Sequence, residues 1–147
     1  DEPIIDGIMR TGMIVQTIFI TAVTLTGFFL GMPQGGIDEA RSVAFTVLSF
    51  SELIRAYTAR SELYSVFQIG VFSNKYMQYA VFASLVLLLA VIYIPFLNPI
   101  FETQPLSWLD WAEIIPLMLV PSIAAEVTKF FLRQNVKREQ AAAQSAA

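Results

Sequence analysis

The sequence predicts an all-α fold, an integral membrane bundle of four transmembrane helices with both termini on the cytoplasmic side. Two observations support this prediction. Hydrophobic residues make up 56% of the 147 residues and charged residues only 14%, whereas about a quarter of an ordinary soluble domain is charged. The apolar residues also gather into stretches near the length of about 20 residues that a bilayer-spanning helix requires.

The first and third spans are free of charge. We expect them at about 11–32 and 76–96, because no Asp, Glu, Lys or Arg occurs from Thr11 to Ile37 or from Tyr76 to Phe101. The segment 31–36 contains three glycines and a proline, a composition typical of a turn. The turn is therefore predicted to end the first span.

The second and fourth spans, at about 42–60 and 113–132, are less uniform. Glu52 and Arg55 interrupt the second. We still predict a crossing there, because without it the ends of the first and third spans would lie on the wrong sides of the membrane. Pro116 and Pro121 are expected to kink the fourth span.

Basic residues set the orientation, because Lys and Arg near the ends of spans favour the cytoplasmic side. With four spans, all but one of the 9 Lys and Arg residues fall on a single side, and the exception is Arg41. That side is predicted to be cytoplasmic and to carry both chain ends. We assign residues 1–138 to one membrane domain and expect a disordered tail at 139–147, where the sequence is small and polar.

Glu52 is the candidate functional residue. A charged side chain near the middle of a span costs roughly 2.5 kcal/mol or more, so it suggests a functional role by default. Ser49 lies three residues before it on the same helix face, and such oxygens suit a hard cation, although calcium takes six to eight of them. The alternatives are an ion pair with Arg55, one turn on, a carboxyl kept neutral by burial, or a proton carrier.

Other polar residues favour structural roles. Glu126 and Lys129, three apart, predict an ion pair near the cytoplasmic end of the fourth span. Asp110 and Glu113 are expected to form a solvated helix start with a favourable dipole interaction. Several small or hydroxylated residues of the first span predict close helix packing. These residues are Gly12, Thr17, Thr21, Thr24 and Gly27.

The composition excludes several classes of function for this chain. It has no Cys and no His, which rules out thiolate metal sites, disulfides and Ser-His-Asp or Cys-His catalysis. The sequence has no GxxxxGK phosphate loop, and its net charge of -3 argues against nucleic acid as a partner. We therefore predict no catalytic residue and no cofactor within this chain.

Several blocks of sequence, in order, resemble the last four membrane helices of P-type cation-transporting ATPases of the calcium-pump and sodium-pump branch. The blocks are Glu2-Pro3-Ile4-Ile5 with Arg10; Arg60-Ser61-Glu62; Ser65-Val66-Phe67-Gln68 with Gly70 and Asn74-Lys75; Ile92-Tyr93-Ile94-Pro95; Leu97-Asn98 with Ile100-Phe101, Leu106 and Trp111; and Glu126-Val127-Thr128-Lys129. The resemblance depends on the order of these blocks together with the four-span pattern.

The resemblance implies a function for a larger protein. In this family ATP hydrolysis drives ion transport through a phosphorylated aspartate, and ATP and magnesium bind in domains that this chain lacks. Its expected partners are the remaining membrane helices and the cytoplasmic domains of the same pump, and the lipid bilayer of the cell membrane, which it would cross several times. Glu52 falls where calcium pumps place an ion-coordinating glutamate of their eighth helix, so the resemblance implies a calcium ligand at this position.

Two alternatives come from different classes of protein. A free-standing four-helix transporter could couple transport to protons through Glu52. A purely structural bundle could anchor or bind other membrane segments. The chain starts Asp1-Glu2-Pro3 rather than with Met, and this start favours a pump segment over a free-standing transporter.

Overall fold

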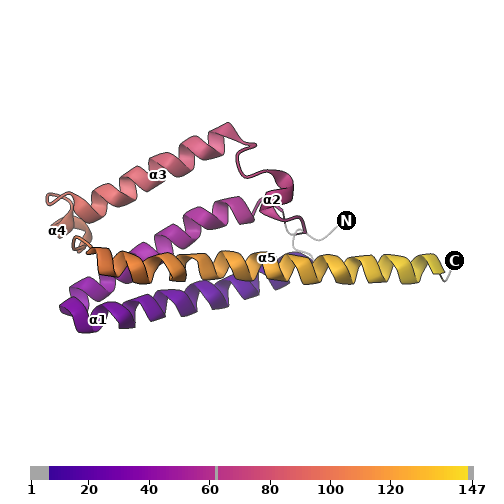
Figure 1. The fold of residues 1–147 in the computed structure, drawn as a ribbon, viewed down its shortest axis with the longest axis horizontal. Helices are drawn as coiled ribbons and strands as arrows, with labels where there is room; N and C mark the ends of the chain where they lie inside the picture. Colours follow the sequence, from indigo (N-terminus) through magenta and orange to yellow (C-terminus); the bar gives the residue numbers. More distant parts are fainter. Residues whose placement is uncertain (1–6, 62, 146–147) are drawn as a thin grey trace.

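The computed structural model describes residues 7–61 and 63–145. All regular structure in these residues is helical, which confirms the all-α prediction. The order of elements is α1 (Gly7–Thr58), α2 (Val66–Ile69), α3 (Lys75–Tyr93), α4 (Asn98–Phe101) and α5 (Trp108–Ser145), as Figure 1 shows. The helices α1, α3 and α5 are long and apolar enough to cross a membrane. The family-like block Glu2–Ile5 and residue Glu62 lie outside the described residues.

α1 is a hairpin of two helical arms. Gly35 and Gly36 have non-helical backbone angles, and the φ of 75° at Gly36 is one that residues with a side chain rarely adopt. We call residues 7–34 the first arm and 37–58 the second arm; Figure 1 shows the chain reversing between them. The turn predicted from the glycine-rich segment is therefore confirmed as a break in the helix.

The two arms approach each other closely just before the turn. A Cβ atom on Gly31 would lie only 2.8 Å from the Cα of Ala40, so the backbones meet where no side chain separates them. Gly27 packs instead against the side chains of Val43 and Val47, and this contact confirms the close packing predicted for that glycine. Thr17 and Thr21, by contrast, are exposed.

The core of the chain lies where the second arm, α3 and α5 meet. Its buried members come from both arms of α1, from α3, from α5 and from the segment that leads into α5. They are Val23, Val43, Val47, Leu88, Ile92, Leu106 and Ile114. At its edge the rings of Phe50 and Trp111 meet edge to face at 5.4 Å, a preferred geometry for aromatic pairs.

α3 begins at a capped end and finishes earlier than predicted. The Asn74 side chain accepts a hydrogen bond from the backbone N–H of Met77, which caps the first turn. The helix ends at Tyr93 rather than at 96, because Pro95 cannot donate to the helical ladder and disfavours helical angles in the residue before it. The side chain of Asn98 then donates to the carbonyls of Val91 (3.1 Å) and Ile92 (2.8 Å) and so ties the loop to the helix end.

α5 is longer than the predicted fourth span at both ends. It starts at Trp108 and continues to Ser145, so the segment we predicted as a disordered tail is helical over 139–145. Alanine and glutamine have high helix propensity, and no Gly or Pro stops the helix there; residues 146–147 lie outside the described part. Pro116 and Pro121 are both incorporated within this single helix.

Candidate functional site

Glu52 lies on a partly exposed face of the second arm. Its side chain is 44% exposed, whereas the neighbouring Ser51 is fully buried and Thr58, farther along, is buried. Ser49 is partly buried. The carboxylate is therefore available to groups outside the described part of the chain.

Arg55 is the partner of Glu52 in this structure. The Arg55 Nε donates to the Glu52 Oε2 at 2.8 Å, so the ion pair that the sequence offered as an alternative is present. Both side chains are more than two-fifths exposed, and exposed pairs of this kind contribute little to stability in water. The contact leaves the second carboxylate oxygen for another ligand.

The described residues contain no group of three or more His, Cys, Asp or Glu side chains that could hold a metal ion. Glu52 and Ser49 would supply only two side-chain groups, whereas calcium takes six to eight oxygens. A calcium site at Glu52 would therefore need most of its ligands from outside this chain.

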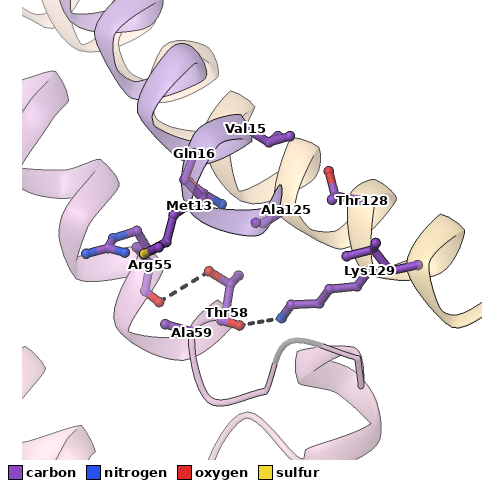
Figure 2. A pocket seen from close by; sticks show the side chains of 11 residues that line it. Met13, Val15, Gln16, Arg55, Thr58, Ala59, Ala125, Thr128 and Lys129 are labelled. Atoms are coloured by element: carbon purple, nitrogen blue, oxygen red, sulfur yellow. Dashed lines mark hydrogen bonds between the residues drawn. The ribbon is translucent and has the colours of Figure 1, made fainter. Parts of the chain in front are cut away.

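Lys129 forms a buried junction between α5 and the end of the second arm (Figure 2). Its side chain is only 7% exposed, and its ammonium donates to the Thr58 carbonyl and, at 3.2 Å, to the Glu126 Oε1. Thr58 is the last residue of α1, and the last carbonyls of a helix have no partner within the helix. The predicted Glu126–Lys129 ion pair is thus confirmed, and Lys129 also caps the second arm.

The Glu126 carboxylate extends this junction to the following loop. Its Oε1 also accepts from the backbone N–H of Val66 at 3.4 Å, at the start of α2. Arg133, about two turns beyond Glu126 on α5, donates through its Nε to the Leu63 carbonyl at 3.0 Å. Two side chains of α5, Glu126 and Arg133, therefore hold the loop between the second arm and α3, a role that the sequence spacing did not reveal.

A cavity of about 50 Å³ lies beside Lys129, between both arms and α5 (Figure 2). Gln16 of the first arm reaches across it, and its side-chain amide donates to the Pro121 carbonyl at 3.1 Å. The buried Gln16 Oε1 has no protein partner among the described residues. The space exceeds the 10–15 Å³ that one water needs, and the polar lining would suit a water.

Asp110 differs from its prediction. We expected a solvated carboxylate, but the residue is fully buried. Its Oδ2 accepts from the backbone N–H (2.6 Å) and the hydroxyl (2.8 Å) of Ser107, while the Ser107 hydroxyl accepts from the Asp110 N–H. This reciprocal arrangement resembles a capping box and satisfies polar groups at the start of α5.

The sequence of this helical chain matches a known family of proteins. The family described as "Cation transporting ATPase, C-terminus" matches residues 1–131, most of the chain. The chain belongs to this family. The resemblance inferred from the sequence blocks is therefore confirmed.

Relatives of this chain are named as calcium-transporting ATPases. It is 36% identical over 96 residues to "Calcium-transporting ATPase 1" of Bacillus cereus, 35% over 119 residues to "Calcium-transporting ATPase 1" of Yarrowia lipolytica, and 34% over 138 residues to "Calcium-transporting ATPase type 2C member 2" of Mus musculus. These matches cover 65%, 80% and 90% of the chain but only 11%, 13% and 14% of the respective relatives. The chain thus corresponds to a small part of each of these three relatives.

Proposed function

We propose that this chain is the C-terminal transmembrane part of an ATP-driven P-type pump that exports calcium across the cell membrane. In this proposal it supports a transport core formed by other helices of the same pump and contributes one ion ligand, Glu52, with Ser49 nearby. ATP and magnesium would act in the domains that this chain lacks. The family match and the calcium-transporting relatives support the proposal.

The partial exposure of Glu52 supports the ligand assignment. A carboxylate in a span is costly unless something compensates it, and the helices of this chain do not bury it. Helices from the rest of the pump could pack against this face of the second arm and bring the missing oxygens. Arg55 would compete with a bound cation, so ion binding would require its guanidinium to turn away from Glu52.

Replacing Glu52 with glutamine in the complete pump is expected to raise the calcium concentration for half-maximal ATPase activity about tenfold, a loss of about 1.4 kcal/mol in binding. Glutamine keeps the shape but removes the charge that a hard cation prefers. Calcium-dependent ATPase activity measures the shift. The matched control is Glu102→Gln, which neutralises an exposed carboxylate in the loop after α4. An unchanged calcium dependence for Glu52→Gln would favour a structural role for this residue.

The proposed membrane arrangement has four crossings, with each arm of α1 crossing once and both termini in the cytoplasm. The hairpin supports this count because the second arm runs back along the first. The basic residues Arg55, Arg60 and Lys75 would then flank one cytoplasmic loop.

Single cysteines can test this arrangement directly, because the chain has no cysteine of its own. We expect Ile37→Cys and Phe96→Cys to react with a membrane-impermeant maleimide from the non-cytoplasmic side. Phe72→Cys should react only from the cytoplasmic side. All three positions are exposed. Labelling of Ile37→Cys and Phe96→Cys from opposite sides would contradict the four-crossing arrangement.

A further inference from the structure

The buried carboxylate of Asp110 has one oxygen without a partner. Ser107 supplies both hydrogen bonds to its Oδ2, but its Oδ1 accepts none among the described residues. A buried oxygen that accepts no hydrogen bond is uncommon in folded proteins. The Asp110 Oδ1 therefore needs a hydrogen-bond donor. None of the ion pairs found among the described residues includes Asp110.

The side chain of Glu39 folds back over the hairpin turn. A Cβ atom on Gly35 would lie only 1.6 Å from the Glu39 Oε2, so this conformation depends on the absence of a side chain at Gly35. Glu39 is partly buried, and its carboxyl group interacts with that of Asp110. Burial first, and then the negative charge and proximity of the Asp110 carboxylate, raise the pKa of Glu39 above its ordinary value of 4.5.

We propose that Glu39 and Asp110 form a proton-binding site in which the protonated Glu39 carboxyl donates a hydrogen bond to the Asp110 Oδ1. Two adjacent carboxyl groups share a proton readily, because both cannot ionise without repulsion. The shared proton would supply the donor that the Asp110 Oδ1 lacks. It would also join the hairpin turn to the first turn of α5.

The neighbouring polar and charged side chains bind other carboxylates, so a proton is the partner that remains for the Glu39–Asp110 pair. Arg41, on the second arm, is bound to Glu102 at 2.9 Å and to Asp38 at 3.8 Å. On the first arm, Gln34 donates to the carboxylate oxygens of Glu113 at 3.1 Å. The nearby cation and amide are therefore already engaged with other carboxylates.

Proton binding should make the stability of the hairpin depend on pH. Because the pKa of Glu39 is raised on folding, its ionisation is disfavoured in the folded state. Its contribution to stability is fully present below the ordinary pKa and is lost as the pH rises through the raised value. The pair lies at the end of the bundle opposite the basic loops, so the proposed orientation would place it on the non-cytoplasmic side. Proton binding itself does not rest on that orientation.

The test is the thermal unfolding of the purified protein in detergent over a mildly acidic to mildly alkaline range. Glu39→Gln keeps a donor toward Asp110 and cannot ionise. We expect this variant to unfold a few degrees above the wild type at alkaline pH, and the difference should vanish at acidic pH. Asp38→Asn, which also removes a carboxylate from the same turn, should show no such pH-dependent difference. A Glu39→Gln difference that is independent of pH, or an equal one in Asp38→Asn, would overturn the proposal.

Infrared spectroscopy provides a second readout that does not depend on unfolding. The carbonyl band of a protonated carboxylic acid should persist in the wild type above the ordinary glutamate pKa, and Glu39→Gln should lack it. Asp110→Asn removes the repelling charge, so the band should titrate at lower pH. Absence of the band in the wild type would contradict proton sharing. A rise in unfolding temperature with calcium or magnesium at alkaline pH, lost in Glu39→Gln, would instead make the pair a cation site and overturn the proposal.

Discussion

Replacing Lys129 with methionine is expected to lower the free energy of unfolding by about 3 kcal/mol, because loss of one partner from a buried ion pair leaves the other uncompensated. Methionine retains the length of the side chain and most of its apolar contacts. The substitution removes the donor to the Thr58 carbonyl and the charge next to Glu126. Denaturant titration in mixed micelles measures the loss.

The matched control is Lys137→Met, which removes an exposed lysine farther along the same helix. This control should change the unfolding free energy little, since exposed charges away from specific contacts contribute little. Equal losses in the two variants would show that the effect comes from the net charge of α5. They would contradict the role of Lys129 as a cap for the second arm.

Gly31→Ala should cause the second large loss, about 2 kcal/mol, because the added methyl group overpacks a contact between two backbones. The new Cβ would lie 2.8 Å from the Ala40 Cα and 3.1 Å from its nitrogen. Backbone atoms cannot move aside as a flexible side chain can, so the arms must separate. The same denaturant titration in micelles measures the change.

Two other glycines of α1 provide a graded control. A Cβ on Gly27 would lie 3.1 Å from the Val47 Cγ2, a side-chain atom, whereas a Cβ on Gly7 would have no neighbour within 4 Å. We therefore expect a smaller loss for Gly27→Ala than for Gly31→Ala, and little change for Gly7→Ala. Comparable losses at all three positions would point to a general effect of alanine on the first arm.

The sequence was sufficient to predict the helical class and the reversal at Gly35 and Gly36. Hydropathy predicts which segments prefer lipid, and a segment rich in Gly and Pro predicts where a helix ends. Hydropathy does not predict where a helix ends outside the membrane, because a polar segment of high helix propensity can continue the helix. α5 therefore begins at Trp108 and extends to Ser145, well beyond the apolar stretch that we took as the fourth span.

The candidate site was predictable only in part. Glu52 and the Glu126–Lys129 pair could be identified, because charges are rare in apolar spans and residues three apart share a helix face. The hydrogen bond from Lys129 to the Thr58 carbonyl was not predictable, because every residue has a backbone carbonyl and the sequence does not show which one a side chain will contact. The burial of Asp110 was also missed, because it depends on how the hairpin turn packs against α5.

The close contact between Gly31 and Ala40 has a consequence for how the chain enters the bilayer during synthesis. The second arm carries Glu52 and Arg55, each of which costs roughly 2.5 kcal/mol or more at the centre of a span. Because the first arm is strongly apolar and already complete when the turn emerges, we expect the two arms to leave the translocon as one helical hairpin. The first arm would then offset the insertion cost of the second, and the Glu52–Arg55 pair would enter the membrane with no net charge.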